Sequence, residues 1–185
     1  MTLLHSSTFK VAVSGHRPNR LPEAEWPRLL RQLDAVMAEL EASRQNRQFV
    51  LLSGLAEGAD RLGAHAALSR GWGLAAVLPF SRTRYLADFP DQRARDEFFE
   101  LLSRAEVIEE RPPADRYADS TTAYAELGNR LVAEADALIV VWDGEAAQGP
   151  GGTVDVMDAA CAKPIPVIWI HARQDLPPQR LGCAA

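Results

Sequence analysis

The chain has 185 residues, of which 47% are hydrophobic, and it carries a formal net charge of −5. This length and apolar content suffice for one domain with a substantial core. The acidic balance argues against a protein that wraps nucleic acid non-specifically, because such binding requires a basic surface. No apolar stretch is long enough to span a bilayer and no secretion signal is visible, so we expect a cytoplasmic protein with free thiols at Cys161 and Cys183.

Short apolar runs alternate with longer helical patterns between residues 9 and 170, which is typical of a parallel α/β sheet. In chain order we expect strand 9–13, helix 22–43, strand 48–53, helix 58–70, strand 74–78, helix 91–104, strand 106–109, helix 118–134, strand 137–142, helix 152–161 and strand 165–170. The pattern predicts a three-layer, Rossmann-like α/β domain over residues 9–171 with a mostly parallel sheet of about six strands. A flexible N-terminus (1–8) and a loose C-terminal tail (172–185) flank it.

Three of the expected strands run into turns that contain glycine: 14–18, 53–60 and 143–153. Because the carboxyl ends of parallel strands share one edge of a sheet, these turns are expected at the edge where open α/β folds hold their ligands. Glycine lets backbone N–H groups approach an anion closely, and the following helix adds its positive dipole end. The turns therefore predict a site for a phosphate-bearing small molecule. The histidines and cysteines lack metal-ligand spacing, so we expect no metal.

The first turn places His16 and Arg17 directly after a strand. Arg17 could fork onto a phosphate, and His16 could donate a hydrogen bond or act as an acid or base; the alternative is that both are solvated loop residues. In the second turn, N–H groups between Gly54 and Gly58 could cradle a phosphate or ribose with the help of Asp60. The alternative is a tight turn in which Asp60 caps its own helix.

The third turn offers the Thr153 hydroxyl at a helix start and the Asp155 carboxylate in the first helical turn. Asp155 could accept ribose hydroxyls or serve as a general base, or it could only stabilise the helix end. Pro79 and Phe80 follow another strand and, together with the loop that carries Arg82 and Tyr85, are candidates for a wall against a base. The predicted ligand-binding residues are Ser14, Gly15, His16, Arg17, Ser53, Gly54, Leu55, Gly58, Asp60, Pro79, Phe80, Asp143, Gly144, Gly151, Gly152 and Thr153, and the candidate catalytic residues are Asp155 and Arg17.

Residues 11–17, 53–60 and 142–153 together resemble the SLOG superfamily, a Rossmann-like group named for its Smf (DNA-processing protein A) and LOG (cytokinin-activating) members. Residues 53–60, followed by Ala67 and Leu68, are similar to the Ser-Gly, Gly, Asp and Ala-Leu pattern of DNA-processing protein A. Thr153 and Asp155 match the threonine and the acidic residue of the LOG motif Pro-Gly-Gly-x-Gly-Thr-x-Glu, with aspartate in place of glutamate. The arginine that LOG enzymes place on the preceding helix falls here on Leu127.

The resemblance implies a nucleotide or nucleotide-derived ligand, and family precedent suggests a homodimer. Three functions stay open: a sensor or processing module that binds a nucleotide, a phosphoribohydrolase that cleaves the N-glycosidic bond of a nucleoside monophosphate, and single-stranded DNA binding of the kind seen in DNA-processing protein A. The acidic net charge disfavours the last of these. A structural remnant of the superfamily without any ligand is a further alternative.

Overall fold

Residues 8–110, 120–146 and 152–182 are described by the structure, a computed structural model of the chain. They form a seven-stranded sheet in the order β4-β3-β2-β1-β5-β6-β7, with every pair parallel except β6 and β7. The strands are β1 (Thr8–Gly15), β2 (Gln48–Ser53), β3 (Gly73–Leu78), β4 (Val107–Glu110), β5 (Ala137–Trp142), β6 (Val167–His171) and β7 (Gln179–Leu181). This confirms the predicted mostly parallel sheet and adds β7, which lies within the expected tail.

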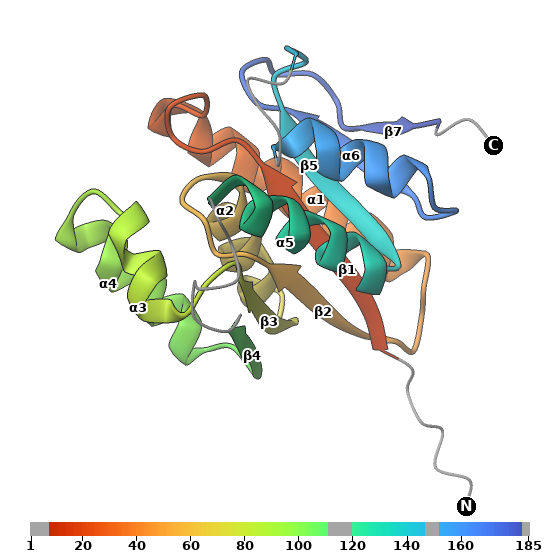
Figure 1. The fold of residues 1–185 in the computed structure, drawn as a ribbon. Helices are drawn as coiled ribbons and strands as arrows, with labels where there is room; N and C mark the ends of the chain where they lie inside the picture. Colours follow the sequence, from red (N-terminus) through yellow and green to blue (C-terminus); the bar gives the residue numbers. More distant parts are fainter. Residues whose placement is uncertain (1–7, 111–119, 147–151, 183–185) are drawn as a thin grey trace, which may run out of the picture.

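Helices cover both faces of the sheet, as Figure 1 shows, with α1 and α2 behind it and α5 and α6 in front. The helices are η1 (Glu23–Glu25), α1 (Trp26–Ala42), α2 (Ala59–Ser69), α3 (Arg82–Tyr85), η2 (Leu86–Asp88), α4 (Gln92–Ser103), α5 (Ser120–Glu134) and α6 (Thr153–Cys161). The predicted three-layer architecture is therefore confirmed. None of the described helices combines the length and the apolar character needed to cross a bilayer.

The central strands are buried on both faces, which explains why they read as continuous apolar runs rather than as alternating patterns. In β1, Val11 and Val13 belong to the core under α1 and α2, and Ala12 belongs to the core under α5 and α6. The register joins Val11 to Leu51 in β2 and to Ala137 in β5. This double burial fixes β1 at the centre of the molecule.

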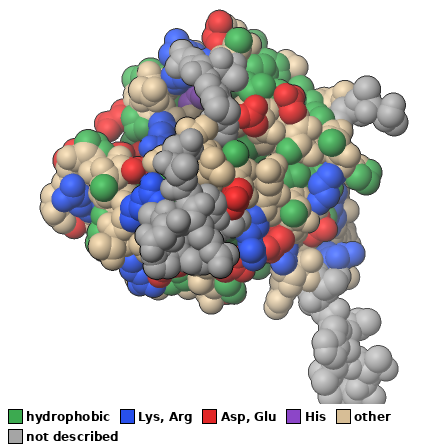
Figure 2. Space-filling model, viewed as in Figure 1, with side chains coloured by type: hydrophobic (Ala, Val, Ile, Leu, Met, Phe, Trp, Pro, Cys, Tyr) green, Lys and Arg blue, Asp and Glu red, His purple; other side chains and the backbone are tan. Residues whose placement is uncertain are grey.

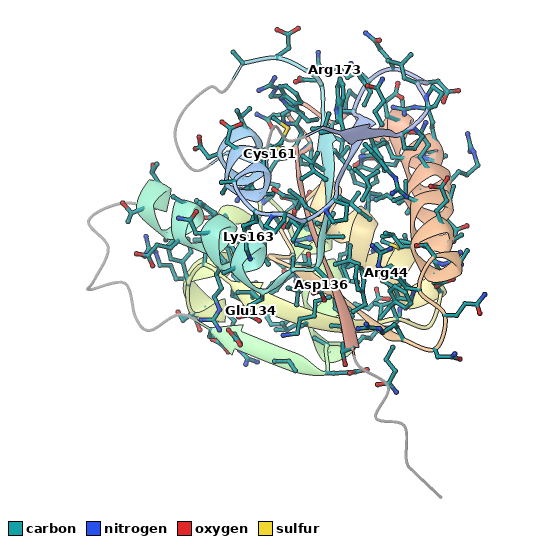
Figure 3. All side chains as sticks on the ribbon, turned by 90° about the vertical axis from the view of Figure 1, so that its right-hand side faces the viewer. Arg44, Glu134, Asp136, Cys161, Lys163 and Arg173 are labelled. Atoms are coloured by element: carbon teal, nitrogen blue, oxygen red, sulfur yellow. The ribbon has the colours of Figure 1, made fainter. Side chains whose placement is uncertain are left out.

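A lysine that follows α6 binds the carboxyl end of α5. Lys163, after α6, donates hydrogen bonds to the carbonyls of Val132 (2.8 Å) and Ala133 (2.9 Å) near the end of α5, beside Glu134 (Figure 3). A lysine at the carboxyl end of a helix satisfies its last carbonyls and complements its dipole. In the same region the expectation of a free thiol at Cys161 is wrong, because Cys161 is disulfide-bonded. That expectation rested on the absence of a secretion signal, which does not show whether two cysteines meet in the fold; Cys183 lies outside the described residues.

Candidate functional site

A cleft of about 440 Å³ opens at the point where the order of the sheet reverses. From β1 the chain continues to α1 on one face, whereas from β5 it continues to α6 on the opposite face. The connections diverge there, and open α/β sheets characteristically hold ligands in the crevice that results. The cleft is lined by the end of β1, the start of α2, one side of α5 and the start of α6. Seven of the predicted residues line it: Ser14, Gly15, His16, Arg17, Asp60, Gly152 and Thr153.

Gly15 is required by close packing at the end of β1. A Cβ atom there would lie 2.5 Å from both the Ala59 Cβ atom and the Val141 carbonyl oxygen. The next residue ties the same elements together, because the His16 N–H donates to the Val141 carbonyl (3.0 Å) and the His16 carbonyl accepts from the Ala59 N–H (3.1 Å). The His16 N–H is therefore bonded within the fold and is not free to bind a ligand. Gly15 allows β1 to pack closely against α2 and β5.

His16, Asp143 and Arg20 form a buried ionic cluster. Arg20 donates two hydrogen bonds to the Asp143 carboxylate, from Nε to Oδ2 (2.9 Å) and from Nη2 to Oδ1 (2.6 Å). His16 Nε2 lies 2.9 Å from Asp143 Oδ1 and 3.2 Å from the Asp143 backbone nitrogen. Burial raises the pKa of Asp143, but the hydrogen bonds from His16 and Arg20 more than offset this and hold it well below its usual value. Asp143 does not line the cleft; it holds His16 and Arg20, which do.

Burial also lowers the pKa of His16 below its ordinary value of 6.5, against the opposing effect of Asp143. The ring is therefore neutral at pH 7, with Nε2 committed to Asp143. His16 belongs to the cleft wall, but its Nε2 atom is not available to a ligand.

Arg17 presents its charge on the cleft wall. Its guanidinium carbon lies 5.0 Å from the centre of the Tyr124 ring, within cation–π range, and its Nη2 atom lies 3.7 Å from Asp88 Oδ2. The Tyr124 hydroxyl donates a hydrogen bond to the same Asp88 carboxylate. Arg17 is 41% exposed. It is thus positioned over α5 by an aromatic face and one long ion pair, which leaves donors for an anion.

The turn after β2 folds back on itself through its own side chains. The Ser53 hydroxyl accepts from the Leu55 N–H (3.1 Å) and donates to the Asp60 carbonyl (3.3 Å). Leu55 has a φ of 54° and Gly58 a φ of 93°, so the chain bends through left-handed conformations at both positions. Ser53, Gly54, Leu55 and Gly58 are buried and do not line the cleft.

Asp60 reaches the cleft wall from the first turn of α2 and is 8% exposed. Its Oδ2 atom accepts a hydrogen bond from the Ala56 N–H (3.3 Å). Burial raises the pKa of Asp60 to about 6, against the opposing effects of the Ala56 N–H and of the charges on Arg17 and Arg61. A carboxyl group that titrates near neutral pH beside a cleft is typical of a functional site.

The turn after β5 contributes less than predicted. Gly152 and Thr153, at the start of α6, line the cleft, whereas Gly144 is exposed away from it with a φ of 84°. Asp155 is exposed on α6; its neighbours Val154 and Val156 line the cleft instead. Gly151 lies outside the described residues.

In the segment expected to wall off a base, Tyr85 lines the cleft but Pro79 and Phe80 do not. Pro79 and Phe80 are buried and do not line the cleft. Phe80 packs against the rings of Tyr85 (6.3 Å between centroids) and Tyr124 (5.6 Å), and these two tyrosines line the cleft in its place.

Tyr85, from the loop expected to wall off a base, also lines the cleft. The rest of the wall comes from residues that sequence reasoning missed: Asn19, Arg20, Ala56, Ser120, Thr121, Tyr124, Leu127, Gly128, Leu131, Val154 and Val156. The helical spacing of Tyr124, Leu127 and Leu131 did indicate one shared face of α5. That spacing does not distinguish a face packed on the sheet from one that also borders a cleft.

A scan of protein-family models and a search of curated proteins find no match. Solved structures do match. DNA processing protein A from Streptococcus pneumoniae has 20% identity and a TM-score of 0.59, over 88% of this chain and 50% of that one. The chain therefore spans half the length of that protein.

Two further solved structures are similar to most of this chain. A single-stranded DNA-binding structure of DNA processing protein A from Helicobacter pylori has 19% identity and a TM-score of 0.54, over 94% of this chain and 67% of that one. The structural-genomics target TM1055 has 16% identity and a TM-score of 0.51, over 86% and 72%. At 16–20% identity these similarities show a shared α/β fold.

Proposed function

We propose that the cleft binds a nucleotide or nucleotide-derived ligand, so that the protein acts as a sensor or processing module for it. The observation that carries this proposal is the meeting of Arg17 with Gly152 and Thr153 at the start of α6 in one cleft at the sheet's switch point. A helix N-terminus and a guanidinium group are both favourable partners for phosphate.

The volume and the lining of the cleft are suited to a nucleotide. Its volume of about 440 Å³ lies within the range of small-molecule sites. Apolar side chains from α5 and α6, including Leu127, Leu131 and Val156, form one wall. Such a wall suits the face of a base, while the polar groups at the end of β1 suit the phosphate.

The geometry gives no support to a phosphoribohydrolase that uses Asp155. That carboxylate is exposed outside the cleft lining, and the position of the LOG arginine is taken by Leu127. Single-stranded DNA binding is named for one of the similar structures, yet positive and negative side chains are interspersed on the face shown in Figure 2. With a net charge of −5, this distribution favours a small ligand over a nucleic-acid strand.

The test is isothermal titration of the protein with the four ribonucleoside 5′-monophosphates and with a short single-stranded DNA. We expect at least one mononucleotide to bind. Arg17→Ala should weaken that binding by about 10- to 100-fold, the effect of losing a hydrogen bond to a charged group. Arg31→Ala, at an exposed position of α1 away from the cleft, is the matched control and should leave binding unchanged.

Three results would count against the proposal. Binding of the DNA without any mononucleotide would favour the nucleic-acid function. Equal effects of the two arginine substitutions would place the ligand outside the cleft. Heat from none of the probes, together with an unchanged melting temperature, would favour a structural remnant. Release of free base during the titration would instead identify a processing enzyme.

A further inference from the structure

The hydroxyl of Tyr85 is buried without a hydrogen-bond partner among the described residues, although Tyr85 lines the cleft. The side chain is 0% exposed and is held by packed rings: Phe89 at 4.9 Å and Phe98 at 5.7 Å between centroids. Because the ring is fixed on these sides, it cannot swing its hydroxyl out to solvent. A buried hydroxyl of this kind can form its hydrogen bond with a polar group that enters the cleft.

The Asp60 carboxylate distinguishes the part of the cleft near Tyr85 from the phosphate end, although Arg17 belongs to both. Asp60, Arg17 and Tyr124 all act electrostatically on Tyr85, and all of them line the same cleft. The Ala56 N–H occupies one acceptor position of the Asp60 carboxylate, which offers about four. The wall of the cleft therefore combines a carboxylate acceptor, a phenol and a guanidinium donor that act on one another electrostatically.

This combination discriminates between ligand groups. A phosphate placed there would meet the Asp60 carboxylate, and an apolar group would leave the phenol without a partner and the remaining acceptor positions of the carboxylate unfilled. A sugar hydroxyl can donate to the carboxylate and accept from the phenol or the guanidinium at once. Two neighbouring hydroxyls would satisfy these groups more completely than one.

We propose that Asp60 and Tyr85 bind the ribose hydroxyls of the nucleotide, so that the cleft selects ribonucleotides over deoxyribonucleotides. This inference rests on the proposed function and specifies its substrate class. Tyr85 acts as a specificity-determining residue, since a ligand without the hydroxyl leaves a buried phenol without a hydrogen-bond partner. Sites built to hydrogen-bond a hydroxyl reject analogues that lack it strongly for this reason.

The experiment titrates the wild-type protein with each ribonucleoside 5′-monophosphate and with its 2′-deoxy and 3′-deoxy counterparts. We expect the ribonucleotide to bind at least about 10-fold more tightly than a deoxy form, as the loss of one hydrogen bond to a charged group predicts. Tyr85→Phe and Asp60→Asn should bring this ratio towards one, mainly by weakening ribonucleotide binding. Asp158→Asn, at an exposed position of α6 outside the cleft lining, is the matched control for Asp60→Asn and should keep the wild-type ratio.

Equal binding of ribonucleotides and both deoxy forms by the wild-type protein would overturn this inference while the proposed function stands. A Tyr85→Phe variant that weakens all three ligands by one common factor would also overturn it, because it would show a merely structural role. If no mononucleotide binds at all, the inference and the proposed function fail together.

Discussion

Replacing Asp60 by asparagine should stabilise the folded protein in the absence of ligand, and the gain should depend on pH. Burial of the carboxyl raises its pKa from 3.8 to about 6, because the charged form is poorly solvated in the cleft wall. Each pKa unit corresponds to about 1.4 kcal/mol, so ionised Asp60 lowers the free energy of unfolding by up to about 3 kcal/mol. Asparagine keeps a carbonyl that can accept from the Ala56 N–H.

The direction in which stability changes with pH depends on whether the folded or the unfolded chain ionises Asp60 first. Below about pH 4 the carboxyl is protonated in both the folded and the unfolded chain, and Asp60 carries no penalty. Between about pH 4 and pH 6 the unfolded chain ionises first, so the contribution of Asp60 falls as the pH rises. Above about pH 6 the penalty is complete. Asp60→Asn should therefore gain up to about 3 kcal/mol more over the wild type at pH 8 than at pH 4.

Urea unfolding of both proteins at pH 4 and pH 8 measures this difference directly. Asp158→Asn, at an exposed position of α6, is the control and should show no pH-dependent gain. The electrostatic account of the cleft would be refuted if Asp60→Asn changed stability equally at both pH values, or destabilised the protein more at pH 8. A stabilised variant that has lost ribonucleotide selectivity would show that the buried charge is retained for binding.

Three further substitutions test the scaffold around the cleft. Asp143→Ala should lower the free energy of unfolding by about 3–5 kcal/mol, because it leaves Arg20 and its charge largely buried without a partner; a loss below about 1 kcal/mol in urea unfolding would contradict this. Tyr85→Phe should raise the stability of the unliganded protein by about 1 kcal/mol, since it removes an unpaired hydroxyl, and a lower melting temperature would show that the hydroxyl has a partner. Gly15→Ala should cost about 3 kcal/mol, because its Cβ atom meets Ala59 and Val141, and a wild-type thermal melt would show that β1 can shift.

Much of the fold could be predicted because the central strands are buried on both sides. Apolar runs such as 137–142, three of which lead into turns that contain glycine, mark strand ends without any tertiary information. β7 could not be predicted in this way. It is a short edge strand whose residues Gln179 and Arg180 are exposed, so its pairing with β6 leaves little apolar pattern in the sequence.

The sequence predicted at which edge of the sheet the site lies, but not which residues line it. Sequence reasoning found the turn that carries Arg17 and the helix start at Thr153, because strand order alone brings them together. It did not separate Asp143 from the ligand residues, since the pairing with Arg20 spans 123 positions. The loop that carries Tyr85 was expected to wall off a base, but the role of the Tyr85 hydroxyl could not be predicted, because hydrogen-bond satisfaction is a property of the folded chain.

A crystal structure of the protein soaked with the tightest-binding ribonucleoside 5′-monophosphate tests the central claim most directly. The account predicts phosphate density beside Arg17 and Thr153, and ribose hydroxyls within hydrogen-bond distance of Asp60 and Tyr85. A nucleotide bound elsewhere on the surface, or a cleft that closes with side chains while the nucleotide is bound, would contradict it.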